Sequence, residues 1–177
     1  MVRDEDISVI LVDKDDNVIG YGDKLDVHRK GQLHRAFSVL LFNENGELLL
    51  QQRASCKYHA PLKWANTCCG HPFPGEEPLD AAVRRTKEEL GLSVTLNPLT
   101  HIYYKKMLDQ GMIEHEYVHV FKGTFQQQAF SPDPQEVANT LWMNPTDIKM
   151  DLVRNPDKYA AWFAHYMEDY FEQLFSN

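Results

Sequence analysis

The chain has 177 residues, 43% of them hydrophobic, which suits one ordinary domain with a single buried core. Its 26 Asp and Glu outnumber its 18 Lys and Arg, so no overall positive field exists to attract nucleic acid or an anionic membrane surface. An anionic ligand therefore has to be bound by a local cluster of cations.

The cysteines and the apolar segments restrict the compartment. Three cysteines, two of them adjacent (Cys68 and Cys69), do not make a disulfide framework. No run of about 20 apolar residues predicts a membrane span, and no leading apolar segment follows a basic start. We expect a cytoplasmic protein with reduced thiols, a monomer or weak dimer that acts on a small molecule and has no nucleic-acid or membrane partner.

The first third of the chain is rich in β patterns. Residues 7–12 and 18–21 predict two strands joined by a polar turn, and 35–43 and 47–53 predict two more joined by a turn that contains Asn-Gly. The polar segment between these pairs carries Lys24 and His28. Residues 54–65 lack periodicity and predict a loop over the sheet, a position that often carries ligand contacts.

A helix is predicted after the turn Cys69-Gly70-His71-Pro72. Glu76-Glu77-Pro78 is a plausible helix start, and Gly91 is the natural stop. Arg85 and Glu89 lie one turn apart, so both can border one site. The apolar stripe expected to face the core is Leu79, Ala82, Val83, Thr86 and Leu90.

The last part of the chain predicts a second hairpin and a terminal helix. Strands are expected at 100–108 and 113–125, joined by 109–112, and an amphipathic helix at 156–175. The sum is a mixed α/β protein, an α/β/α sandwich with a mixed central sheet. We expect residues 1–177 to form a single domain on which the amino-terminal hairpin and the carboxy-terminal helix pack.

The stretch 66–91 carries a specific spacing. Its residues Gly70, Glu76, Arg84, Glu88, Glu89 and Gly91 match the Nudix box, a loop-helix-loop pattern that holds a divalent metal against a diphosphate. The residue after Arg84, where the box has a second glutamate, is Arg85. Because hydrolysis on this fold generally uses several helix carboxylates to hold metal ions, a cation at this place argues against a pyrophosphohydrolase.

Two phrases complete a second pattern, Leu33-His34-Arg35-Ala36-Phe37-Ser38 and Asn66-Thr67-Cys68-Cys69-Gly70-His71-Pro72. With them the chain closely resembles the type I isopentenyl-diphosphate isomerases of the Nudix superfamily, from about Lys24 to Trp162. The resemblance implies a Nudix fold and reversible conversion of isopentenyl diphosphate to dimethylallyl diphosphate in isoprene biosynthesis.

One metal site is indicated by residue type and completed by the resemblance. Glu114 and Glu116 are two apart on a strand and share a face, while His115 faces away, and two such carboxylates repel unless a cation lies between them. Three imidazoles with two carboxylates suit Zn²⁺ or Mn²⁺ better than Mg²⁺. The matching family positions are His28, His34, His71, Glu114 and Glu116.

The resemblance also implies a second ion, most plausibly Mg²⁺, that bridges the diphosphate. Its protein ligands would be Glu89 and the backbone carbonyl of Cys69. The alternative for Glu89 is a solvated carboxylate paired with Arg85. The cations expected on the phosphates are Lys24, Arg53, Lys57 and Arg85.

An allylic proton shift requires one group that gives a proton and another that removes one across a flat substrate. Cys69 suits one role, because a thiol is mostly protonated at neutral pH, and Glu116 suits the other. Tyr104, on the partner strand, is expected to hydrogen-bond Glu116 and to relay its proton. The order in which Cys69 and Glu116 act stays open.

The intermediate of such a shift is a tertiary carbocation, which an indole face stabilises by about 2 kcal/mol or more when desolvated. By the resemblance that indole is Trp162, in a dry pocket that keeps water from the cation. Trp64 and Trp142 are expected to be packing residues, and Cys68 and Cys56 small buried or surface residues. The rival hypotheses are a Nudix pyrophosphohydrolase and a non-catalytic diphosphate-binding module.

Overall fold

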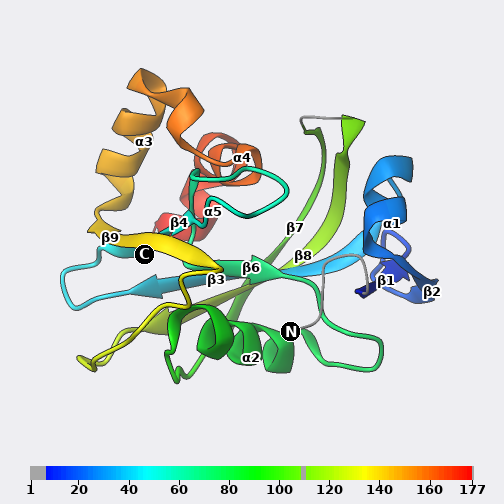
Figure 1. Ribbon diagram of the computed structural model, residues 1–177, viewed down its shortest axis with the longest axis horizontal. Coiled ribbons are helices and arrows are strands. Elements are labelled where there is room, and N and C mark those ends of the chain that lie inside the picture. Colours follow the sequence, from blue (N-terminus) through cyan, green and yellow to red (C-terminus); the bar gives the residue numbers. More distant parts are fainter. Residues whose placement is uncertain (1–6, 109–110, 177) are drawn as a thin grey trace.

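The computed structural model describes residues 7–108 and 111–176, which form a curled mixed sheet between two layers of helix (Figure 1). Helix α2 (Pro78–Leu90) covers one face. The other face is covered by α3 (Pro145–Arg154), α4 (Ala161–Asp169) and α5 (Phe171–Phe175). The α/β/α arrangement predicted from the sequence is confirmed.

Strand β3 (His34–Phe42) is the centre of the sheet. It pairs in parallel with β8 (Ile113–Thr124) over its whole length, from His34 opposite Glu116 to Phe42 opposite Thr124. Its other edge is shared in succession by β1 (Ser8–Val12), β6 (Cys68–Gly70) and β4 (Leu48–Arg53). Segments far apart in the sequence therefore meet along one strand.

The remaining strands extend the sheet outward. Each pairs antiparallel with a neighbour already described: β1 with β2, β4 with β5 and β9, and β8 with β7. Their bounds are β2 (Val18–Asp23), β5 (Trp64–Ala65), β7 (Asn97–Met107) and β9 (Val137–Met143). Both predicted hairpins with described strands are confirmed, and the turn residues Asp109 and Gln110 lie outside the described residues.

The side chains of β3 alternate between two cores, as the period of a strand requires. Ala36 and Leu40 face the larger core with the apolar residues of α3 and α4. Phe37 and Val39 face the smaller core under α2, with Cys68, Ala81 and Ala82. The stripe predicted for α2 is confirmed for Ala82, Thr86 and Leu90, which are buried, and partly for Leu79 and Val83, which are half-buried.

Between β3 and β4 the sheet splits, and the polar pair Asn66-Thr67 fills the gap. The Thr67 hydroxyl accepts from the Leu41 amide at 3.0 Å and donates to the Leu49 carbonyl at 2.7 Å. The Asn66 amide donates to Ser38 Oγ at 2.8 Å. Since both residues are fully buried, these bonds replace backbone pairing that the split removes and fix the start of β6.

Two parts of the chain differ from the expectations. Residues Lys24–Lys30 form a helix, α1, which the polar composition of this segment does not indicate. The Asp23 side chain caps its first turn by accepting from the Asp26 amide, and Gly31, at φ +62°, ends it. Because Lys24 and His28 lie on this short helix and not on a strand, they are positioned beside the sheet, where α1 packs against β8.

The terminal helix predicted for 156–175 is wrong as one element. It is divided into a 3₁₀ turn (Pro156–Lys158), α4 and α5. Tyr159 is extended because it bridges Trp64, and the Ala160 amide donates to the Trp64 carbonyl at 2.8 Å. Strand β9 and helix α3 were not predicted. Trp64–Ala65, expected in the loop 54–65, forms β5, and Cys69 and Gly70, expected in a turn, belong to the short strand β6. No helix within 7–108 and 111–176 is long and apolar enough to cross a membrane.

Candidate active site

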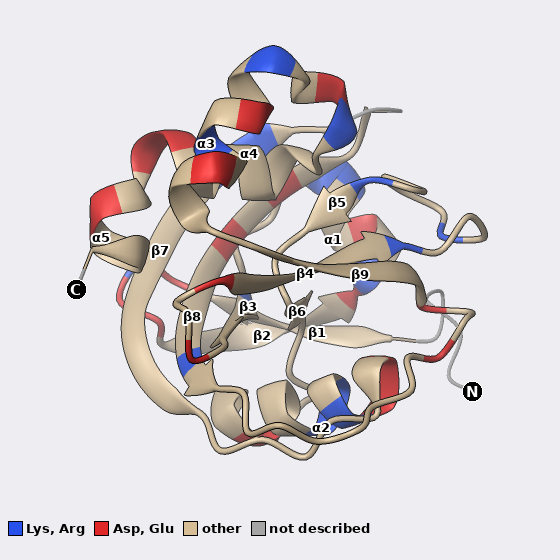
Figure 2. Cartoon of the chain, turned by 90° about the vertical axis from the view of Figure 1, so that its left-hand side faces the viewer, with Lys and Arg blue, Asp and Glu red and all other residues tan. Residues whose placement is uncertain are grey.

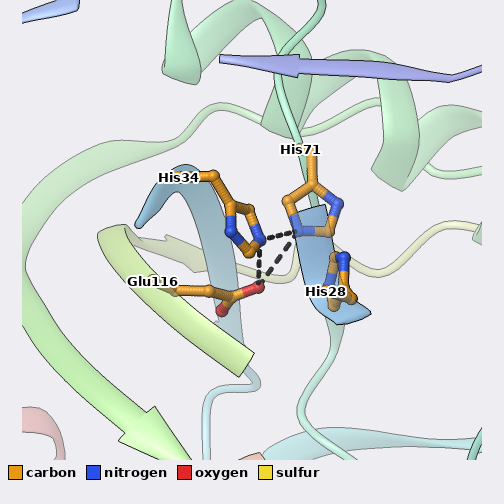
Figure 3. Close-up of side chains that lie close together, drawn as sticks. All are labelled: His28, His34, His71 and Glu116. Atoms are coloured by element: carbon orange, nitrogen blue, oxygen red, sulfur yellow. Dashed lines mark hydrogen bonds and ion pairs between the residues drawn. The ribbon is translucent and has the colours of Figure 1, made fainter. Parts of the chain in front are cut away.

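Four predicted metal ligands converge at the end of β3 (Figure 3). One ligand atom from each of His28, His34, His71 and Glu116 lies within 4.8 Å of every other. His34 Nε2 is 3.2 Å from His71 Nε2, and Glu116 Oε1 is 3.0 Å from His71 Nε2 and 3.5 Å from His34 Nε2. The residues come from α1, β3, β8 and the segment after β6, so only the fold unites them.

Backbone carbonyls set the tautomers of two of these imidazoles. His28 Nδ1 is 2.7 Å from the Lys24 carbonyl and His34 Nδ1 is 2.9 Å from the Gln32 carbonyl. A carbonyl only accepts, so each Nδ1 carries the proton and each Nε2 keeps a lone pair in the neutral ring. Histidines that bind a metal through one ring nitrogen usually donate the proton of the other nitrogen to a carbonyl or carboxylate in this way.

The electrostatics of the cluster fit a cation. Burial, with the charge of His34, lowers the pKa of His28 to about 4, and burial lowers the pKa of His71 to about 3, so these rings are neutral at physiological pH. A proton on His71 Nε2 can be donated to Glu116. The lone pair of His34 Nε2 still faces the same carboxylate, and these two electron-rich groups repel each other. A divalent ion among these atoms removes the conflict, and the nitrogen and oxygen donors suit Zn²⁺ or Mn²⁺.

Glu114, the fifth predicted ligand, is outside this four-residue cluster and is connected to it through Tyr104. The Tyr104 hydroxyl lies 2.7 Å from Glu114 Oε2 and 2.9 Å from Glu116 Oε2. Burial, with the charge of Glu116, raises the pKa of Glu114 to about 8. Burial acts the same way on Glu116, but its contacts with His34 and His71 hold its pKa well below the ordinary value. A proton on Glu114 and the hydroxyl proton of Tyr104 thus form a chain toward Glu116.

Cys69 faces the same side of the sheet as Glu116. It is opposite Ser38 on β3, Ser38 is opposite Val120 on β8, and Val120 is an even number of residues from Glu116. Cys69 is half-buried against the larger core, and burial raises the pKa of its thiol to about 12. The thiol is therefore protonated at neutral pH, as expected from the sequence.

The neighbours of Cys69 have different environments. Cys68 is fully buried on the α2 side, which confirms its expected structural role. A Cβ on Gly70 would lie 3.0 Å from the Phe37 ring, so glycine allows β6 to approach β3 closely. Cys56 is exposed.

Trp162 projects from α4 into the larger core and is only 3% exposed. The Arg53 guanidinium carbon is 5.2 Å from the centroid of its ring, and the ring of His59 is 5.6 Å away. Arg53 donates to the His59 carbonyl from Nε at 3.3 Å and from Nη2 at 3.2 Å. A predicted phosphate-binding cation and the predicted carbocation-facing indole are thus in contact.

Each box carboxylate on α2 or just before it has an arginine partner, and Figure 2 shows both signs of charge on this helix. Arg84 binds Glu76 through two bonds of 2.7 and 2.8 Å. Arg85 donates to Glu88 at 2.7 Å and to Glu89 at 2.5 Å. Glu89 is 5% exposed, so it is paired with Arg85 but is not the solvated carboxylate of the alternative reading.

The other predicted cations lie in two groups. Lys24 is buried at the start of α1, with Nζ 5.5 Å from the centroid of the Tyr58 ring. Lys57 Nζ is 2.7 Å from one carboxylate oxygen of Glu136, and Arg85 Nη2 is 3.3 Å from the other. One carboxylate therefore joins the cations of the 54–65 loop and of α2.

Three residues at the site have no place in the sequence-based prediction: Gln51, Glu136 and His59. Gln51 Nε2 donates to Glu89 and to the Thr67 carbonyl, both at 2.9 Å. The one sequence signal that could have identified Gln51 was the presence of a glutamine within an apolar strand pattern. Glu136 and His59 lie in irregular segments, where periodicity gives no indication of direction.

Comparison with known proteins places this geometry in a family. Residues 32–164 match the NUDIX domain. "Isopentenyl-diphosphate Delta-isomerase" of Serratia proteamaculans is 43% identical over 164 residues, covering 93% of this chain and 91% of that protein. The protein of the same name in Streptomyces coelicolor is 48% identical over 162 residues, covering 90% and 81%.

Solved structures support the fold alone. A protein of Deinococcus radiodurans, DR0079, has a TM-score of 0.74 at 17% identity and covers 90% of this chain and 96% of its own. The MutT protein of Methanosarcina mazei has a TM-score of 0.64 at 20% identity and covers 80% and 94%. The domain match and the 43% and 48% identities to the Serratia and Streptomyces proteins establish the family. The chain belongs to the NUDIX-domain proteins and, among them, to the isopentenyl-diphosphate Delta-isomerase family.

Proposed function

We propose that this protein interconverts isopentenyl diphosphate and dimethylallyl diphosphate by an allylic proton shift. The single observation that carries this function is the identity of 43% to 48% to proteins named for that activity, over 90% or more of the chain. The geometry supports it, because Cys69 and Glu116 face the same side of the sheet beside a buried indole.

Cys69 and Glu116 are the proposed proton-transfer pair. One adds a proton to the terminal methylene carbon of the alkene, which leaves a tertiary cation at the neighbouring carbon. The other removes a proton from the methylene carbon adjacent to that cationic carbon, one position away from the carbon that bears the diphosphate oxygen. The electrons of that C–H bond form the new double bond to the cationic carbon. The Tyr104 hydroxyl, bonded to both Glu114 and Glu116, is the proposed path by which the carboxylate recovers its proton.

The proposed metal residues are His28, His34, His71, Glu114 and Glu116, with Zn²⁺ or Mn²⁺ as the ion. When bound, the ion supplies positive charge that holds Glu116 in place and sets its proton affinity. The four converging donor atoms support this assignment. Glu114 is included because its Oε2 shares the Tyr104 hydroxyl with Glu116, and a bound ion would favour its carboxylate form.

The diphosphate is proposed to lie among Lys24, Arg53, Lys57 and Arg85, with Mg²⁺ held by Glu89 and the Cys69 carbonyl. Glu89 already has one oxygen on Gln51, at 2.9 Å, which orients the carboxylate. Its other oxygen accepts from Arg85 at 2.5 Å, so one carboxylate is shared by the proposed ion site and a proposed phosphate-binding cation.

Trp162 is proposed to face the cationic carbon. Its burial among the apolar side chains of the larger core excludes water, which would trap the cation as an alcohol. We also propose that residues 1–177 act as a single domain.

The decisive experiment is incubation of the protein with isopentenyl diphosphate and Mg²⁺ in deuterated water. We expect dimethylallyl diphosphate that carries deuterium in a methyl group, because the added proton comes from an exchangeable group of the protein. Release of inorganic phosphate or of isopentenyl monophosphate would instead indicate the pyrophosphohydrolase. Unchanged substrate, bound but unlabelled, would indicate the diphosphate-binding module.

A further inference from the structure

We propose that His59 is a further substrate-binding residue, whose Nδ1–H donates a hydrogen bond to a phosphoryl oxygen of the diphosphate. This inference rests on the proposed function and adds a neutral, directional contact to the four cations already assigned. His59 lies in the irregular segment between β4 and β5, where it was not predicted as a site residue.

The first support is an unmet hydrogen bond. Within 7–108 and 111–176, three buried side-chain atoms lack a partner: His59 Nδ1, Asn66 Oδ1 and Trp162 Nε1. Two of the three are on rings whose centroids are 5.6 Å apart. A buried donor without a partner is destabilising, so two of them on neighbouring rings indicate a place completed by a polar ligand.

The second support is the tautomer of His59. Arg53 Nη2 lies 3.5 Å from His59 Nε2, and a guanidinium only donates. His59 Nε2 is therefore the acceptor of this weak contact, and in the neutral ring the proton is on Nδ1. The unpartnered atom is a donor, which selects an acceptor-rich ligand such as a phosphate.

The third support is the charge around the ring. Burial and the neighbouring Arg53, with Lys24, His28 and Lys57 adding to them, lower the pKa of His59 to about 2. Cations that surround an imidazole closely enough to keep it neutral also attract an anion to the same place. Three of these neighbours, Arg53, Lys24 and Lys57, are the cations assigned to the diphosphate.

The competing interpretation is that His59 only packs on Trp162. Three variants separate the two: His59→Asn, His59→Leu and His59→Ala. The asparagine amide places a donor where Nδ1 lies but has no atom in the position of Nε2, so it isolates the donor from the Arg53 contact. Leucine and alanine have no donor, and alanine also tests the effect of lost packing. His101→Leu, at an exposed position of β7, controls for removal of a histidine.

The measurement is the dissociation constant of inorganic diphosphate, by calorimetry with Mg²⁺ and the metal-loaded enzyme, beside the melting temperature of each variant. We expect His59→Leu and His59→Ala to weaken binding about tenfold, as loss of one hydrogen bond to a charged group does. His59→Asn and His101→Leu should stay within about threefold of the wild type. In turnover, the KM for isopentenyl diphosphate should rise in the leucine and alanine variants with kcat little changed.

Two results would overturn the inference. One is a loss of less than about fivefold in both variants without a donor. The other is a loss in His59→Asn equal to that in His59→Leu, which would assign the effect to the Arg53 contact. Because binding is measured without turnover, a wild type that binds diphosphate and fails to isomerise would refute the proposed function and leave this result standing.

Discussion

Helix α2 and the four-residue cluster on the other side of the site both present carboxylates, but the charges are arranged differently. Glu76, just before α2, and Glu88 and Glu89 on it each accept from an arginine at 2.5 to 3.3 Å. In the cluster, Glu116 has imidazoles at 3.0 and 3.5 Å, and two of the surrounding rings have pKa values lowered below 5. The helix is internally neutralised, whereas the cluster still requires positive charge.

This contrast explains what Arg85 does to the Nudix helix. The guanidinium takes the carboxylates that several metal ions would need for hydrolysis, and it holds Glu88 and Glu89 in place. The group of residues that still needs a positive charge is His28, His34, His71 and Glu116. Under the proposed function, the same fold presents a carboxylate and a thiol on one side of the sheet in place of a set of carboxylates that activates water.

The largest expected effect is at the thiol. Cys69→Ala should lower kcat by about a thousandfold, because it removes one of the two proton-transfer groups. Diphosphate binding and the melting temperature should be nearly unchanged. The assay is deuterium incorporation into dimethylallyl diphosphate.

Cys68→Ala is the matched control on the opposite face of the same strand. It deletes a buried sulfur in the smaller core, so a small loss of stability and near-normal turnover are expected. Equal activity of both variants would remove Cys69 from the mechanism.

Glu116→Gln tests whether the cluster, rather than the helix, has the greater demand for a cation. Loss of a residue that only supports a metal ligand lowers metal affinity by up to about a hundredfold. Because Glu116 is a proposed ligand itself, metal affinity should fall by at least that factor, and turnover should fall with it. Titration with Zn²⁺ and Mn²⁺ measures the first effect.

The control is Glu88→Gln on α2, where two arginines already compensate the carboxylate. Its affinity for the cluster metal should match that of the wild type. If Glu116→Gln keeps full activity after metal is stripped, the cluster is incidental to catalysis.

Trp162→Ala should slow isomerisation roughly thirtyfold, the factor that corresponds to about 2 kcal/mol of cation–π stabilisation. Trp162→Phe should lose less, because it keeps an aromatic face. Trp142→Phe, in a separate apolar cluster, controls for the loss of an indole. Equal rates for the wild type and both Trp162 variants would exclude stabilisation of the cation by this residue.

The smallest expected effect is on stability alone. The Arg84 hydrogen bonds lower the pKa of Glu76 below its ordinary value of 4.5. The pair therefore stabilises the fold above about pH 4.5, and the contribution is lost as the pH falls through the lower pKa of the folded state. Glu76→Gln should cost about 1 kcal/mol in urea unfolding at neutral pH.

As the pH falls below 4.5 the difference between Glu76→Gln and the wild type should shrink, because the wild-type carboxyl gains its proton on acidification. A difference that grows on acidification would contradict the role given to this ion pair. Turnover of the variant at neutral pH should stay close to that of the wild type, in contrast to Glu116→Gln.

The expectations for separate strands and for α2 were correct because their signals are local. Two β-rich runs joined by an Asn-Gly turn predicted β3 and β4, and Gly91 predicted the end of α2, where it adopts φ +70°. The terminal helix was wrong for a non-local reason: Tyr159 and Ala160 leave the helical conformation to pair with Trp64, almost a hundred residues earlier in the chain.

The sequence by itself determined the helix in which Arg85 replaces a glutamate of the box, and the shared face of Glu114 and Glu116. These follow from spacing within one element, which fixes the direction of side chains. Only the tertiary structure decided that Glu116 meets three imidazoles, that Glu114 reaches them through Tyr104, and that His59 lies against Trp162. Such contacts depend on how β3 pairs with β8 and β6 and on how loops fold over the sheet, and no periodicity along the chain encodes them.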